Sequence, residues 1–146
     1  MQAYPHHYLV EAMARAEGDV TNAAPGLPAL ATAPPAEFGG PGDRWSPETL
    51  LVAAVADCLI LTFRAVAGAS SVPWLDIACR AEGVLDRVDG VTRFTELRLH
   101  ARLELPPGGD TARAERLLEK AEKACLVTNS LNVEPKLTVE VVTARS

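Results

Sequence analysis

Three cysteines, Cys58, Cys79 and Cys125, are the residues of this chain with the most reactive side chains. A thiolate is a strong nucleophile, and two thiols that meet can interconvert with a disulfide. A buried cysteine can also be an ordinary small apolar residue. Residue type alone favours core packing for Cys58 and Cys79 and leaves both interpretations open for Cys125, so the positions of the three thiols in the fold decide between them.

Cys58 lies in the middle of an apolar segment, Trp45 to Gly68, which we expect to form one helix. Ser46 suits the N-cap, Pro47 the first turn, and Glu48 the positive end of the helix dipole. Because the apolar residues are not confined to one stripe, we expect burial on most sides. The longest uninterrupted apolar run is far shorter than the roughly 20 residues that span a bilayer. A helix in a protein core or dimer core is therefore expected, not a membrane span.

The segments after this helix carry the other two thiols. Residues 75–86 alternate apolar and polar side chains, and we expect one face to consist of Leu75, Ile77, Cys79, Ala81 and Leu85. An Asp89-Gly90 turn leads to a return strand whose apolar face consists of Leu97, Leu99, Ala101, Leu103 and Leu105. A helix from Thr111 has apolar residues at three- and four-residue spacings, which places Cys125 on its buried side near its end.

The remaining segments complete an α+β pattern. Residues 8–33 read as weak strands, 34–44 as a loop, and 136–141 as a closing strand. We interpret the chain as a single domain over 1–146, made of N-terminal strands and loop (1–44), a central helix (45–68), and a hairpin, helix and strand (74–146).

Composition excludes several function classes. The 146 residues are 48% hydrophobic and 23% charged, which is ordinary for a soluble protein. The net charge is −5 and only three residues are lysine, so nucleic acid is not an expected partner. The N-terminal segment lacks the pattern of a secretory signal, so we expect a cytoplasmic protein. His6, His7 and His100 form no metal-binding pattern, and neither a metal nor a cofactor is expected.

Two segments around the cysteines carry a more specific signal. They read Trp45-Ser46-Pro47-Glu48-Thr49-Leu50-Leu51 leading to Ala56-Asp57-Cys58, and Ala121-Glu122-Lys123-Ala124-Cys125 followed by Asn129-Ser130-Leu131. In these segments the chain resembles the OsmC/Ohr family of organic hydroperoxide reductases. The resemblance extends from the loop at Glu37-Phe38-Gly39-Gly40 to the final strand.

This resemblance implies an OsmC-like α+β fold and an intertwined homodimer, in which long central helices pack between antiparallel sheets built from both chains. It also implies a peroxidatic cysteine at Cys58, a resolving cysteine at Cys125, and an arginine–glutamate pair that serves the first thiol. Glu48 matches the glutamate and Arg15 is the best match for the arginine, with Arg44 and Arg64 as alternatives.

The implied function is the reduction of organic hydroperoxides, in an apolar pocket, by a thiol that passes through a sulfenic acid and a disulfide with Cys125. A dithiol, in the family often a protein-bound lipoyl group, would reduce that disulfide. Arginine suits such a site because it stays charged and stabilises a thiolate. Asp57 would oppose thiolate formation if its side chain lay close to Cys58.

Two other functions remain open from the sequence. One is a binding or stress-related scaffold with the same fold and little turnover. Asp57, which would oppose thiolate formation, and the choice among three arginines motivate it. A cysteine acyl hydrolase would need a histidine partner, and none is well placed.

The spacing of Glu48 and Cys58 bears on how a site could assemble. Ten positions on a straight helix correspond to about 15 Å of rise and about 80° of rotation, so the two side chains cannot touch. Arg15 must bridge them, the helix must bend, or Glu48 must come from a partner chain. An antiparallel pair of central helices would allow the last arrangement, so we expect a site at or near a dimer interface.

Overall fold

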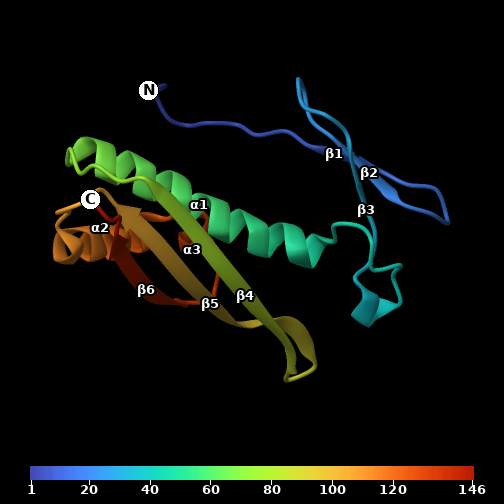
Figure 1. Ribbon diagram of the computed structural model, residues 1–146. Coiled ribbons are helices and arrows are strands. Elements are labelled where there is room, and N and C mark those ends of the chain that lie inside the picture. Colours follow the sequence, from blue (N-terminus) through green and yellow to red (C-terminus); the bar gives the residue numbers. More distant parts are fainter. The chain divides into compact units, whose positions relative to one another are not determined.

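The computed structural model describes residues 1–146, which form two compact units, Met1–Leu51 and Val52–Ser146. Each unit contains one three-stranded sheet, and the long helix α1 (Pro47–Ala69) begins in the first unit and continues through the second (Figure 1). Helices and sheets alternate along the chain, which confirms the predicted α+β class. The organisation of both units into one domain stays a prediction.

The first unit is built on three short strands that pair in sequence order. Strands β1 (Glu11–Met13), β2 (Val20–Ala23) and β3 (Leu30–Thr32) form an antiparallel meander. A single 3₁₀ turn, η1 (Ala36–Phe38), follows in the expected loop. At Gly40 a Cβ atom would lie 1.7 Å from the carbonyl oxygen of Pro34, so this position accepts only glycine. The glycines of this loop therefore serve a tight chain reversal.

The start of α1 is capped as the sequence predicts. The backbone N–H of Thr49 donates to Ser46 Oγ at 3.1 Å, and the N–H of Ser46 donates to Thr49 Oγ1 at 2.9 Å. This reciprocal pair satisfies donors that a helix start leaves open. The helix ends at Ala69, one residue beyond the expected stop at Gly68.

The sheet of the second unit consists of β4 (Asp76–Val88), β5 (Val91–Leu105) and β6 (Pro135–Thr143), in that order. Asp89 and Gly90 join the first two strands with φ values of 51° and 78°, as the two-residue hairpin requires. The third strand pairs parallel with β5, so the expectation of antiparallel sheets is wrong for this strand. Two helices, α2 (Thr111–Ala124) and α3 (Leu126–Asn129), lie between β5 and β6 and provide the crossover that parallel strands need.

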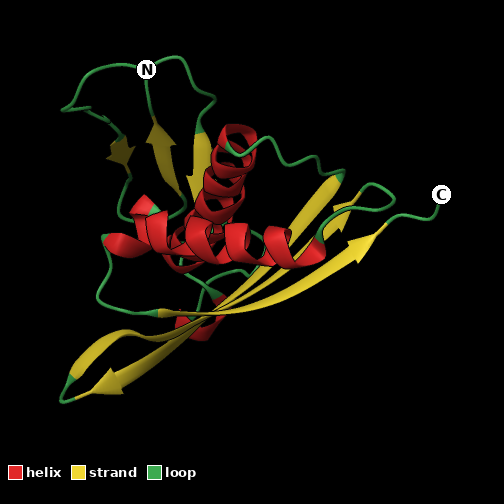
Figure 2. Ribbon diagram, turned by 90° about the vertical axis from the view of Figure 1, so that its left-hand side faces the viewer, coloured by secondary structure: helices red, strands yellow, loops and turns green.

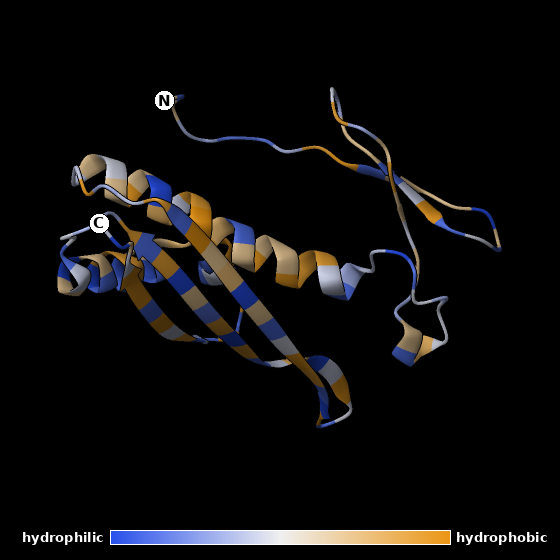
Figure 3. Ribbon diagram, in the orientation of Figure 1, coloured by the Kyte–Doolittle hydropathy of each residue, from blue (hydrophilic) through white to orange (hydrophobic).

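One face of this sheet is apolar and the other is charged, which Figure 3 shows as alternating bands along the strands. Helices α1 and α2 cover the apolar face (Figure 2). The core consists of residues of α1, β5 and α2: Val55, Leu59, Phe63, Ala67, Leu97, Leu99, Ala101, Leu103, Leu105, Ala114, Leu117, Leu118 and Ala121. The predicted inward positions of β5 are confirmed by this set, as are those of α2 from Ala114 to Ala121, whereas Ala124 at the end of α2 is exposed.

The predicted inward positions of β4 are only partly correct. The register shifts between Val84 and Leu85, where a bulge interrupts the ladder. A one-residue shift moves the following side chains to the other face. Leu85 is accordingly 36% exposed, and Leu75 lies before the strand and is 55% exposed.

Burial of α1 differs from the expectation. Only one stripe, formed by Val55, Leu59, Phe63 and Ala67, is buried, and Leu61 on another face is 58% exposed. By length and composition α1 could also cross a membrane, with 28% of its most apolar window buried. The buried stripe belongs to the core that α1 shares with β5 and α2.

Candidate functional site

Cys58 and Cys125 come together in the second unit. Cys58 lies in the middle of α1 and is half-buried, whereas Cys125 ends α2 and is 1% exposed. Each of these two thiols affects the pKa of the other, and the backbone N–H groups of Leu126 and Val127 lower the pKa of Cys58. The end of α2 and the start of α3 thus form a cradle beside this thiol of α1.

This cradle makes Cys58 the more acidic of the two thiols. Burial raises the pKa of Cys58, but the hydrogen bonds from Cys125, the Val127 N–H, Thr62 and the Leu126 N–H outweigh burial and bring the pKa below its ordinary value. Burial and the neighbouring Cys58 raise the pKa of Cys125. Cys58 is therefore the preferred thiolate of the two.

Sequence reasoning missed Thr62, whose Oγ1 lies 3.8 Å from Cys58 Sγ. Its position four residues after Cys58 is the signal that could have found it, since side chains at that spacing are neighbours on a helix. Asp57 is exposed, and its charge is not among the influences on the pKa of Cys58. No effect of this acidic neighbour on the thiol is found.

Cys79 occupies the inward-facing position of β4 that its strand pattern predicts, and it packs half-buried against the core. Burial, together with the charge of nearby Cys125, raises the pKa of Cys79 to about 11. At neutral pH this thiol keeps its proton, so Cys79 suits packing rather than nucleophilic attack.

The predicted arginine and glutamate lie in the first unit and do not pair there. Arg15 is exposed in the connection between β1 and β2 and forms no ion pair. Glu48 is half-buried and lines a mainly apolar cavity of about 360 Å³. Of the two alternatives, Arg44 bonds Asp19 at 3.1 Å and Arg64 is exposed on α1. No arginine of this chain therefore forms an ion pair with Glu48.

The arrangement of the second unit suits thiol–disulfide chemistry. A half-buried thiol with a lowered pKa has a second thiol close enough to affect that pKa. Once Cys58 is oxidised to a sulfenic acid, that partner is placed to displace water and form a disulfide.

Comparison with known proteins gives a family match over most of the chain. A family model described as OsmC-like protein matches residues 40–140. The uncharacterized protein YmaD of Bacillus subtilis is 30% identical over 112 residues, which cover 73% of this chain and 75% of that protein.

Solved structures agree with this match. A crystal structure from Legionella pneumophila is described as an organic hydroperoxide resistance protein OsmC and predicted redox protein. It is 30% identical, covers 95% of this chain and 100% of its own, and gives a TM-score of 0.78. An organic hydroperoxide resistance protein from Elizabethkingia anophelis is 23% identical, covers 97% of this chain and 100% of its own, and gives a TM-score of 0.79, which supports the fold.

Proposed function

Because the chain belongs to the OsmC-like protein family, we propose that it is a thiol-dependent peroxidase that reduces organic hydroperoxides to alcohols. The observation that carries this proposal is the proximity of Cys58, whose pKa is lowered, to Cys125, since each thiol affects the pKa of the other. The 30% identity to a protein described as an organic hydroperoxide resistance protein supports the substrate class.

The proposed reaction begins with attack of the Cys58 thiolate on one peroxide oxygen. The O–O bond breaks, the alkoxide leaves and takes up a proton to become the alcohol, and Cys58 becomes a sulfenic acid. Cys125 then attacks this sulfur, water leaves, and a Cys58–Cys125 disulfide forms. An external dithiol, such as a protein-bound lipoyl group, returns both cysteines to thiols by exchange and is itself oxidised. The proximity of the two thiols, each of which affects the pKa of the other, supports the second step.

Glu48 and Arg15 are proposed to serve the thiolate from a second copy of the chain. They form no ion pair with each other within one chain, and Glu48 and Cys58 are ten positions apart on one helix, which favours a site that two chains complete. Arginine would offer donors to the peroxide oxygens, and the carboxylate would orient the guanidinium.

The exposed apolar surface of α1 supports a homodimer. Only one stripe of this helix is buried within the chain, and Leu61 is 58% exposed. Large exposed apolar patches mark interaction sites, and a second copy of α1 would cover this one. Light scattering on the eluting protein tests this proposal, and a monomer at working concentration would refute it. We further propose that the homodimer works in the cytoplasm.

A scaffold with little turnover is the second candidate. The observation that favours it is that no arginine is among the groups that lower the pKa of Cys58. In the family mechanism an arginine stabilises the thiolate, so its absence from one chain would weaken catalysis if no partner supplied it.

Thiol counting separates the two candidates. The reduced protein is mixed with an equimolar amount of cumene hydroperoxide, and free thiols are then titrated. The peroxidase loses two thiols, as does the matched control Cys79→Ser counted over its remaining cysteines, whereas Cys58→Ser loses none. Cys125→Ser stops at a sulfenic or overoxidised Cys58 that mass spectrometry detects. Unchanged thiols in the parent protein would favour the scaffold.

A further inference from the structure

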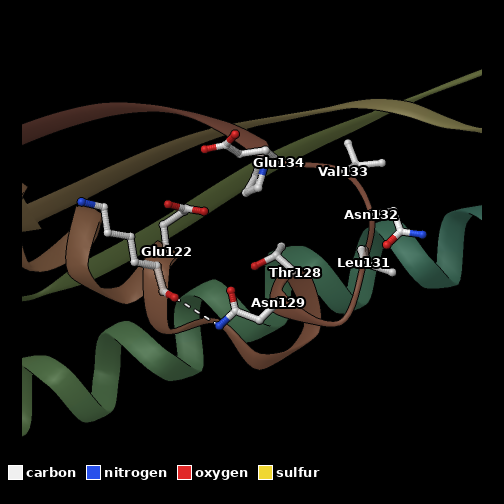
Figure 4. Close-up of a pocket in the computed structure, with 9 residues that line it drawn as sticks. Glu122, Thr128, Asn129, Leu131, Asn132, Val133 and Glu134 are labelled. Carbon is white, nitrogen blue, oxygen red and sulfur yellow. Dashed lines mark hydrogen bonds between the residues drawn. The ribbon is translucent and has the colours of Figure 1, made fainter.

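A cavity of about 530 Å³ lies in the second unit, where the end of α2, the short helix α3 and the segment leading into β6 meet (Figure 4). It borders the thiol pair at Thr128, and neither Cys58 nor Cys125 lines it. Its walls are formed by Glu122, Lys123, Thr128, Asn129, Leu131, Asn132, Val133, Glu134 and Pro135. A volume of this size accommodates a small organic molecule.

Two neutral side chains present hydrogen-bond acceptors to this cavity. Thr128 Oγ1 donates its proton to the Cys125 carbonyl oxygen at 3.1 Å, so the hydroxyl keeps only lone pairs to offer. Asn129 Nδ2 donates to the Lys123 carbonyl oxygen at 3.1 Å, which leaves Oδ1 free to accept. Figure 4 shows both oxygens turned toward the cavity.

Two carboxylates add negative charge to the same walls. Glu122 and Glu134 form no ion pair and accept no side-chain hydrogen bond. Burial and the charge of Glu134 raise the pKa of Glu122, against a smaller opposing effect of Lys123. Lys123 is thus near but does not neutralise the pair, and the lining keeps one excess negative charge.

The rest of the wall includes apolar side chains, Leu131, Val133 and Pro135. One water molecule occupies only about 30 Å³. A single metal ion with a bound water would therefore fill a small part of the cavity and leave the apolar wall without a partner. An aliphatic chain with a cationic head uses both parts of the cavity, because such side chains bury their stems and keep their heads with polar groups.

We propose that this cavity binds an aliphatic ammonium group, with its N–H donors among Glu122, Glu134, Thr128 and Asn129 and its stem along the apolar wall. A free amine and a lysine side chain of a partner protein share this chemistry. The inference does not rest on the peroxidase proposal, because the two carboxylates that carry it, Glu122 and Glu134, are not among the groups that affect either thiol.

Titration with pentylammonium, followed by amide NMR of residues 122–135, tests the proposal. We expect shifts concentrated at the cavity, and a loss of affinity of about tenfold in Glu134→Gln, as for one charge-assisted hydrogen bond. Glu122→Gln should behave alike. The matched control is Glu119→Gln, which removes the same charge from an exposed position of α2 outside the cavity and should leave the affinity unchanged. The NMR spectrum also reports whether each variant is folded.

Neutral 1-pentanol provides the chemical control and should bind more weakly by at least the same factor. Equal binding of the alcohol, unchanged affinity in Glu134→Gln, or no binding of pentylammonium would each overturn the proposal. A capped peptide with one central lysine distinguishes the sources. Binding as tight as that of the free amine assigns the site to a protein side chain, and exclusion of the peptide assigns it to a small amine.

Discussion

Replacing Gly83 by alanine tests how closely α1 approaches the sheet that supports it. A Cβ atom at this position of β4 would lie 2.7 Å from Phe94 Cε1 and 2.8 Å from Val52 Cγ2. Both distances are shorter than carbon atoms tolerate, and the valine belongs to α1. Overpacking of this kind costs about 1–3 kcal/mol, and alanine recovers about 0.5–1 kcal/mol of backbone entropy. We expect a net loss of about 1–2 kcal/mol in the free energy of unfolding.

Urea denaturation at one fixed protein concentration measures this change, because the midpoint shifts while the slope stays constant. The matched control is Gly68→Ala, since a Cβ atom there would have no neighbour within 4 Å. Gly68 lies within α1, where alanine is the better helix former, so this variant should gain about 0.5 kcal/mol. The same chemical change should thus have opposite signs at the two sites.

Stability of Gly83→Ala equal to or above that of the parent protein would refute the close approach. Val52→Ala in the same background should recover part of the loss, and the double-mutant cycle measures that coupling. The variant also bears on the proposed site. Because Cys58 lies six positions after Val52 on α1, displacement of the helix should slow formation of the disulfide with Cys125.

Three further predictions concern the thiols and one helix end. Iodoacetamide at neutral pH should label Cys58 first, because a lowered pKa leaves more of this thiol as thiolate. Peptide mapping should show that labelling of Cys79 increases until the pH reaches about 11. Labelling of Cys79 before Cys58 would contradict this order. Thr62→Val removes a donor to the Cys58 sulfur, so the pKa of Cys58 should rise and its alkylation at neutral pH should slow, whereas an unchanged rate would exclude this hydrogen bond. Asp110→Ala removes the N-cap of α2 and should lower the free energy of unfolding by about 1 kcal/mol in urea denaturation, and no loss would mean that water replaces the cap.

Local patterns in the sequence predict much of the second unit because each is fixed by side chains close in the chain. The Ser46 cap, the Asp89-Gly90 turn and the alternation along β5 depend on neighbours within a few residues. The resemblance to the OsmC family is confirmed by the family match over residues 40–140. Features of longer range were harder: the parallel pairing of β6 depends on a crossover, and the bulge after Val84 leaves no signal in an alternating pattern.

The thiol site, like the fold, could be predicted from the sequence only in part. That Cys125 lies near a helix end follows from helical spacing, but the donors from Leu126 and Val127 are backbone groups, which no residue type reveals. Thr62 was accessible from its spacing to Cys58 and was missed because threonine is common in helices that carry no function.

The predicted pairing of Arg15 with Glu48 stays a prediction, and its physical requirement can be stated. Glu48 begins the helix that carries Cys58, about 15 Å along its axis, and its neighbours within one chain are mostly apolar. An unpaired carboxylate in such surroundings is costly, and a guanidinium is the group that best compensates it. If a second copy brings an arginine to Glu48, dimer formation and completion of the thiol site are one event. Dilution to monomers should then slow oxidation of Cys58 by hydroperoxide, even though the contact between Cys58 and Cys125 lies within one chain.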